Sequence, residues 1–343
     1  MESSCNSKSL GLDPKLGFDI GYDYARYGLH LPSSVREAAE ALPPQIFQGH
    51  RYGSQKFLLT RPRGDRYVRK WLQLRVNAWR RLRHFDDRIT PDYLRTIDLP
   101  YCPVTRVTLE HSSTSDTTWS VDRIYNGAGY APGNLAVTSA RANTAKGELT
   151  TARVVRILQG ESSRQLAPTL TREQWRRQIC MMAWSDPSVP SEASSRLTMA
   201  VLPPPRTLCH SPFTAFQVVL SLAMIGRPLR NGVDPIQVAI DLVPTKKTRR
   251  QIIEMVLVLK RLASLNARRL ANEGNGGPIA LYAVEDAWAS DAVVLHWERI
   301  VRKSEAVQFL PAMACLGGRP GKREDSYDGW ALASGGYDTP CHN

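Results

Sequence analysis

Apolar residues recur at helical spacing along most of the chain. One face of residues 66–85 is apolar at steps of three and four, which predicts an amphipathic helix. The residues of this face are Val68, Leu72, Val76, Trp79 and Leu82. Helical patterns and start and stop signals predict further helices elsewhere. These span residues 33–42, 149–159, 171–184, 213–225, 235–242, 246–271 and 282–303.

Residues 119–146 break this helical pattern. Segments 119–125 and 135–138 have the composition of strands, and the stretch 127–133 between them contains the Gly, Pro and Asn of a tight turn. Residues 139–146 are good helix formers. The sequence therefore predicts a β-hairpin closed by a short helix, within an α+β protein that is predominantly α-helical.

Three oxygen-bearing side chains occupy the corners of this predicted unit. Asp122 lies in the first strand, Asn134 at the start of the second and Asn143 in the helix. Carboxylate and amide oxygens are hard ligands that suit Mg²⁺ or Mn²⁺ and leave coordination positions for water and phosphate. Taken singly, an Asp in a strand or an Asn after Gly is usually turn chemistry. The ordered combination favours a metal site.

Residues 101–147 also carry a set of short motifs in order. They are Cys102-Pro103-Val104, Asp122-Arg123-Ile124, Gly129-Tyr130, Gly133-Asn134, Arg141-Ala142-Asn143 and Lys146-Gly147. In this order they resemble the HNH, or ββα-metal, endonucleases, and most closely the small bacterial and phage members. The resemblance implies a small central ββα-metal module, with Asp122 and Asn143 as ligands of one divalent ion and Asn134 orienting the catalytic group.

The chain departs from the family at its general base. Arg123 stands where the family has His, and a guanidinium cannot accept a proton from water at any useful pH. Tyr125, on the same strand face, or His111 could replace the base. Alternatively, metal-bound water supplies the nucleophile while Arg123 holds the phosphate, or catalysis is lost and the module only binds.

Positive charge is concentrated just before this module. Residues 51–100 contain thirteen Lys and Arg against five Asp and Glu, a surplus of eight within the chain's +13, whereas residues 101–150 contain four of each. A basic helix at this position would supply phosphate contacts and a salt-sensitive affinity for DNA, or alternatively for RNA. The predicted contacts are Arg66, Arg69, Lys70, Arg80, Arg81 and Arg83, with Arg141 and Lys146 near the scissile phosphate.

Several alternative interpretations of these residues are structural. A basic helix can be only a solvated surface, and Lys146 can be only a helix C-terminal cation before Gly147. Tyr67, Trp71 and Trp79 could stack on bases, but at helical spacing such residues more often belong to a core.

Composition sets broader expectations. The six cysteines lack paired spacing, so we expect reduced thiols, a buried Cys102 and no structural zinc. His210 and His296 are expected to be structural. The N-terminal residues contain no signal-peptide pattern and no apolar run is long enough to cross a bilayer, so we expect a cytoplasmic protein without a membrane partner.

The expected organisation has four parts: a partly disordered segment 1–50, a basic helix and HNH-like module at 51–150, a helical domain at 151–316 and a disordered tail at 317–343. The function this predicts is divalent-metal-dependent hydrolysis of DNA phosphodiester bonds. The alternative is a catalytically degenerate HNH-fold protein that binds DNA or has a structural role, because of Arg123.

Overall fold

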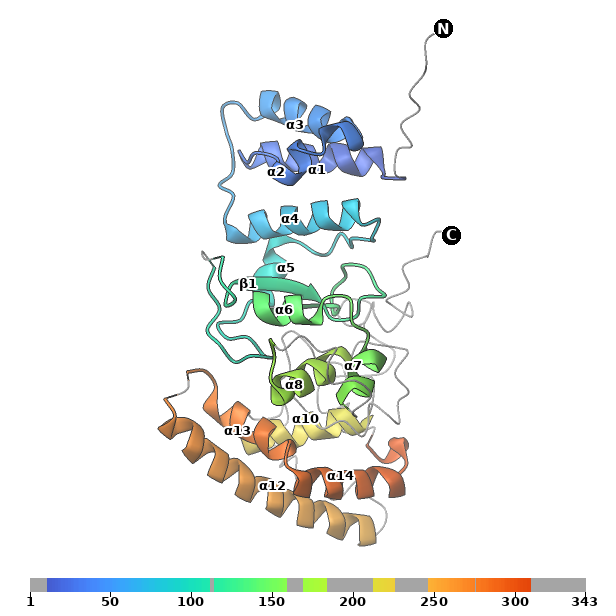
Figure 1. The fold of residues 1–343 in the computed structure, drawn as a ribbon, viewed down its shortest axis with the longest axis vertical. Coiled ribbons are helices and arrows are strands. Elements are labelled where there is room, and N and C mark those ends of the chain that lie inside the picture. The colour runs from blue at the N-terminus through green and yellow to red at the C-terminus, as the bar shows by residue number, and fades with distance from the viewer. Residues whose placement is uncertain are drawn as a thin grey trace. The chain divides into compact units, whose positions relative to one another are not determined.

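The protein is described by a computed structural model covering residues 11–111, 114–158, 169–183, 212–225, 246–274 and 276–309. These residues are predominantly helical and contain one two-stranded antiparallel sheet, as the sequence predicts (Figure 1). The chain divides into two compact units. Of the described residues, the first unit contains residues 11–96 and the turn 127–132, and the second contains residues 97–126 and those from 133 to 309.

The first unit is built from helices. Their bounds are α1 Pro14–Arg26, α2 Ser33–Arg36, a 3₁₀ turn Ala39–Ala41, α3 Gln45–Lys56, α4 Arg66–Arg80 and α5 Pro91–Thr96. The predicted helix 33–42 is therefore divided into a short α-helix and a 3₁₀ turn. Helices α1 and α3 are not predicted by the sequence analysis.

Glycines allow α1 and α3 to approach closely. A Cβ on Gly21 would lie 1.9 Å from the carbonyl oxygen of Ile46, and one on Gly49 would lie 2.0 Å from that of Phe18. One helical turn further along α3, a Cβ on Gly53 would lie 2.9 Å from the carbonyl oxygen of Tyr22 in α1, whereas one on Gly17 would lie 2.9 Å from the Trp79 ring of α4. Backbone therefore packs directly against backbone at this crossing.

Helix α4 completes the core of the first unit. The Asp65 carboxylate caps its N-terminus by accepting hydrogen bonds from the backbone N–H groups of Tyr67 and Val68 at 3.0 and 2.9 Å. The predicted apolar face is buried against α1, α2 and α3, except at one position. The helix ends at Arg80, so Leu82 leaves the helical pattern with a φ of 52° and is exposed.

The second unit contains the sheet and the remaining helices. Their bounds are β1 Trp119–Arg123, β2 Leu135–Ser139, α6 Ala140–Lys146, α7 Thr151–Leu158, α8 Arg172–Ala183, α10 Pro212–Met224, α12 Lys246–Asn272, α13 Ile279–Trp288, α14 Asp291–Lys303 and a 3₁₀ turn Ala306–Phe309. The predicted helix 282–303 is two helices, because the Ser290 hydroxyl caps a new N-terminus at α14. The predicted helix 235–242 and His210 lie outside the described residues.

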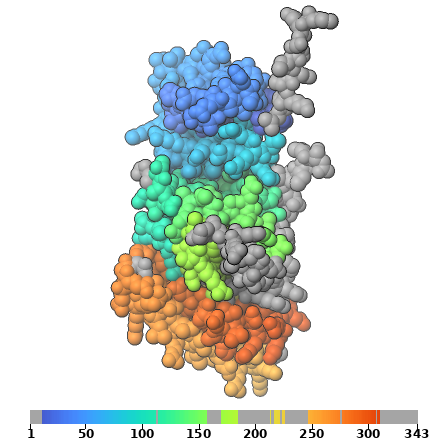
Figure 2. Space-filling model, viewed as in Figure 1, coloured from blue at the N-terminus to red at the C-terminus, as the bar shows by residue number. Residues whose placement is uncertain are grey.

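The C-terminal helices share one apolar core. Phe216 of α10, Trp288 of α13 and Trp297 of α14 are buried together, and the Trp288 indole donates a hydrogen bond to the Ser221 hydroxyl at 2.8 Å. Helices α12 and α14 are neighbouring orange and red-orange bands in the space-filling view (Figure 2). Among the described residues, none of the helices has the length and apolar character needed to cross a membrane.

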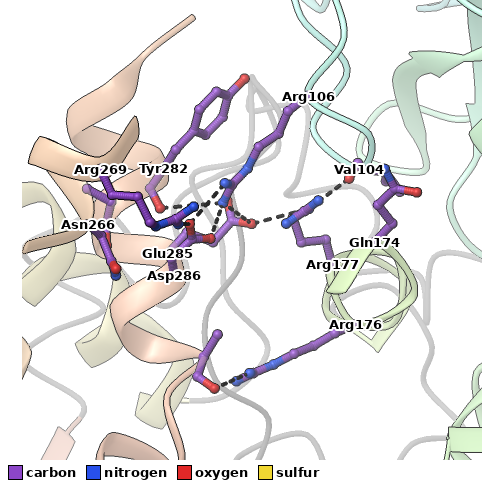
Figure 3. A network of polar contacts seen from close by, with 12 residues as sticks. Val104, Arg106, Gln174, Arg176, Arg177, Asn266, Arg269, Tyr282, Glu285 and Asp286 are labelled. Atoms are coloured by element: carbon purple, nitrogen blue, oxygen red, sulfur yellow. Dashed lines mark hydrogen bonds and ion pairs between the residues drawn. The ribbon is translucent and has the colours of Figure 1, made fainter. Parts of the chain in front are cut away.

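A polar network joins the loop before the hairpin to the C-terminal helices (Figure 3). Arg106 binds the Asp286 carboxylate of α13 at 2.6 Å and lies 3.2 Å from Glu285. Arg177 of α8 donates to the Val104 carbonyl at 2.7 Å and lies 3.6 Å from Glu285. Because these groups are largely buried, their charges depend on one another for stabilisation.

We predict that Gly21→Ala destabilises the first unit. Alanine is the better helix former by about 1 kcal/mol, but its methyl group must push α1 away from the Ile46 carbonyl. We expect a net loss of about 1–3 kcal/mol, measured by urea unfolding followed by circular dichroism. Gly11→Ala is the control, because a Cβ at Gly11 meets no atom within 4 Å. Equal stability of the two variants would show that the helices do not cross at Gly21.

Candidate functional site

The hairpin and α6 form the predicted strand, strand and helix in the predicted order. The strands pair antiparallel from Trp119 opposite Ser139 to Arg123 opposite Leu135. The Ser139 hydroxyl then accepts a hydrogen bond from the N–H of Ala142 at 3.3 Å and caps α6. The helix ends at Gly147, whose φ of 46° favours glycine.

Helix α6 contacts one face of β1. Side chains alternate along a strand, so Ser120 and Asp122 share this face. The Asn143 amide donates a hydrogen bond to the Ser120 hydroxyl at 2.7 Å. One helical turn further on, Lys146 reaches Asp122. Asp122 and Asn143, the two predicted metal ligands, therefore lie on the same side of the hairpin.

Asp122 and Lys146 form a buried ion pair. The Lys146 ammonium lies 3.3 Å from Oδ1 and 3.2 Å from Oδ2 of Asp122, and it donates a hydrogen bond to the Asn126 side-chain oxygen at 2.9 Å. The exposed fractions are 0% for Lys146 and 7% for Asp122. Burial raises the pKa of Asp122 and lowers the pKa of Lys146, while the attraction between the two charges opposes both shifts.

The divalent ion that the HNH resemblance implies does not fit this arrangement. Both carboxylate oxygens of Asp122 face an ammonium, and the Asn143 amide is directed to Ser120. Mg²⁺ and Mn²⁺ need oxygen ligands that no other cation holds. In the part of the chain that the structure describes, no three His, Cys, Asp or Glu side chains gather as a metal site.

Asn134 positions the end of β1. It is fully buried, its Oδ1 accepts a hydrogen bond from the Tyr125 N–H at 2.8 Å, and its Nδ2 donates one to the Tyr125 carbonyl at 3.1 Å. Its own carbonyl accepts from the Ile124 N–H at 2.8 Å. One side chain thus fixes the backbone of the residues that follow Arg123.

Arg123, which replaces the general base of the family, and the two candidate substitutes, Tyr125 and His111, have different surroundings. Arg123 is half-buried and donates to the Asn126 carbonyl at 3.1 Å, and Tyr125 is held through its backbone by Asn134. The His111 ring lies 5.1 Å from the ring of Trp119, and its Nε2 lies 3.8 Å from the Asp98 carboxylate. Because Trp119 points to the opposite face of β1 from Asp122, His111 is beside the face away from the ion pair.

The two cations predicted near the scissile phosphate are not equally accessible. Lys146 is completely buried, so a phosphate at the surface cannot contact it. Arg141 is half-buried and donates to the Gln174 side-chain oxygen of α8 at 3.2 Å. Burial of Lys146 is the feature that the sequence analysis missed, because a lysine before Gly147 has the pattern of an exposed helix end.

The basic residues of α4 and of the turn after it differ in exposure. Arg66, Arg69 and Arg80 of α4 and Arg81 after it are exposed, whereas Lys70 and, beyond the helix, Arg83 are half-buried; burial lowers the pKa of Lys70. Tyr67 and Trp79 are buried in the first unit, as expected for core residues. Trp71 is half-buried beneath Arg75 and donates to the Ile89 carbonyl at 2.7 Å. The helix thus presents arginines rather than aromatic rings to solvent.

The structure also shows the surroundings of Cys102 and a cavity in the second unit. Cys102 is buried as expected, and its sulfur accepts hydrogen bonds from the N–H groups of Thr105 and Ser139. A cavity of about 910 Å³ lies beside the network of Figure 3. Its lining includes Arg106, Arg177, Arg269, Glu285 and Asp286, so charges of both signs are mixed and the cavity does not favour anions.

Comparison of the chain with family models, with curated proteins and with solved structures finds no match.

We predict that Asn134→Ala destabilises the second unit by about 1–3 kcal/mol, because it removes both side-chain hydrogen bonds to the Tyr125 backbone inside the protein. Thermal unfolding measures the effect. Asn143→Ala is the control: its amide is half-buried and donates to one hydroxyl, so its cost should be smaller. A larger loss for Asn143→Ala would contradict the positioning role of Asn134.

Proposed function

We propose that this protein binds DNA and carries an HNH-like ββα module that does not hydrolyse it. The observation that carries the proposal is the group of exposed arginines at α4, with Arg69 and Arg80 on one side of the helix and Arg81 directly after its end, in a chain of net charge +13. Arginines exposed along and just beyond a helix neutralise phosphates without requiring a base sequence. The opposite side of α4 is buried, so the helix has a fixed surface to present.

The ββα module supports the non-hydrolytic form of the proposal. Lys146 faces the carboxylate that the HNH resemblance assigns to a metal, and Arg123 replaces the usual base. A module with neither an open carboxylate nor a proton acceptor at these two positions lacks the groups that metal-assisted hydrolysis requires. Its hydrogen-bonded hairpin remains suited to a binding or structural role.

We predict that DNA binding depends steeply on salt through α4. Binding of a labelled DNA duplex, followed by fluorescence anisotropy between about 50 and 200 mM salt, should weaken strongly as salt rises. Replacing Arg69, Arg80 and Arg81 together with Gln should lower the affinity at least tenfold. It should also reduce the slope of log K against log salt by about 0.9 for each phosphate that is no longer neutralised.

The control for this test keeps the net charge equal. Replacing Arg36, Arg51 and Lys303 with Gln removes three exposed cations elsewhere and should leave the slope nearly unchanged. If both triple variants lose affinity equally, general charge and not α4 accounts for binding. If wild-type binding is insensitive to salt, the proposed role of α4 is wrong. A single-stranded RNA of matched length tests whether RNA is the preferred partner.

A second candidate is the metal-dependent DNA endonuclease that the sequence predicts. The observation in its favour is that Asp122 and Asn143 lie on the same side of the hairpin, and that Asp122 Oδ2, although 3.2 Å from the Lys146 ammonium, is buried and accepts no hydrogen bond among the described residues. For this candidate to hold, Lys146 must leave the carboxylate.

Plasmid nicking distinguishes the two candidates. We expect no conversion of supercoiled plasmid to the open-circular form by the purified protein with Mg²⁺ or Mn²⁺, because Lys146 holds Asp122. Nicking that disappears in both Asp122→Ala and Asn143→Ala would establish the endonuclease instead. Nicking that persists in both variants would come from another source and leave the first candidate in place.

A further inference from the structure

Lys146 occupies an environment that is unusual for a lysine. It is in the last turn of α6, where lysine is normally solvated, but its exposed fraction is 0%. A charged group is removed from water at large cost unless oxygen acceptors surround it. The protein supplies these acceptors from β1 and from the residue that begins the following turn.

The oxygens around the ammonium form a compact set. Both carboxylate oxygens of Asp122 lie within 3.3 Å of Nζ, and the Asn126 side-chain oxygen lies at 2.9 Å. The Asn126 amide nitrogen donates to the Gly147 carbonyl at 2.9 Å, which fixes the side chain with its oxygen toward Lys146. A carboxylate and an amide oxygen facing one point are also the ligands that a hard divalent ion takes.

We propose that the Lys146 ammonium is the resident cation of the ββα module, and that it closes a divalent-ion site made by Asp122 and Asn126. Asn126 has no place among the residues that the HNH resemblance names, so this oxygen set is defined by the structure. Shortening Lys146 removes the competing charge and leaves the carboxylate and amide oxygens facing the space it filled. The inference depends on the hairpin and α6 alone and does not require DNA binding.

Mn²⁺ binding tests the proposal. Electron paramagnetic resonance measures free Mn²⁺ in the presence of the wild-type chain, Lys146→Ala, and Lys146→Ala combined with Asp122→Asn. We expect wild type to leave the signal of free Mn²⁺ unchanged, and Lys146→Ala to bind Mn²⁺ at least tenfold more tightly than wild type. The double variant should lose this gain. Asn126→Ala in the Lys146→Ala background should weaken the gained site.

Thermal unfolding covers the case in which Lys146→Ala folds poorly. Because the variant leaves the Asp122 charge buried without its partner, its Tm should fall. Either Mn²⁺ or propylammonium, which restores the three lost carbons and the ammonium, should raise the Tm again. Neither addition should raise the Tm of the double variant. Lys146→Met keeps most of the length of the side chain without its charge, so Mn²⁺ and the alkylammonium should raise its Tm less than that of Lys146→Ala.

Two results would overturn the proposal. One is Mn²⁺ binding by the wild-type chain that Asp122→Asn abolishes, since the site would then be open with Lys146 present. The other is a Lys146→Ala variant that neither binds Mn²⁺ nor regains stability with Mn²⁺ or propylammonium. Either result is independent of whether the protein binds DNA, because no nucleic acid is present in the test.

Discussion

The ion pair between Asp122 and Lys146 is the interaction on which the ββα module depends. It joins the middle of β1 to the end of α6, and both groups are removed from water. A buried pair adds little net stability compared with an apolar pair of equal size, but removing one partner typically costs about 3–5 kcal/mol. The pair therefore acts chiefly as a constraint, since each charge tolerates burial only while the other is beside it.

Both units contain largely buried ion pairs, but they differ in how closely their backbones pack. In the first, glycines at the crossing of α1 and α3 let backbone pack on backbone, and the ion pair of Asp23 with Arg75 joins α1 to α4. In the second, buried charges recur: Arg106 joins Glu285 and Asp286, as Lys146 joins Asp122. The loop before the hairpin is thus tied to α13 as specifically as α6 is tied to β1.

The sequence predicts the parts of this structure that local pattern determines. The hairpin, α6, α4 and α12 follow from short-range periodicity and turn residues, and they are found where predicted. Helices α1 and α3 escape prediction because glycine weakens the helical pattern. The four-residue spacing of their glycines, Gly17 to Gly21 and Gly49 to Gly53, was the available signal.

The parts of the site that depend on contacts between residues distant in the sequence could not be predicted. The placement of Asp122, Asn134 and Asn143 around one hairpin follows from sequence spacing, because the elements are consecutive. The burial of Lys146 does not, since a helix end before glycine is usually solvated and only the approach of Asn126 encloses it. The contact between Arg106 and Asp286 spans 180 residues, and no local pattern connects them.

Charge balance explains why an anionic partner is expected at α4 and not at the hairpin. Residues 101–150 contain equal numbers of acidic and basic side chains, and Lys146 already neutralises the buried carboxylate. The module therefore requires no external cation to be electrically balanced, and it has little attraction for a polyanion. Residues 51–100 carry the surplus of eight positive charges, and α4 exposes several of them. Residues 151–343 carry a further surplus of seven positive charges, so in the proposed DNA complex long-range attraction would come from α4 together with basic residues after the hairpin, and not from the hairpin itself.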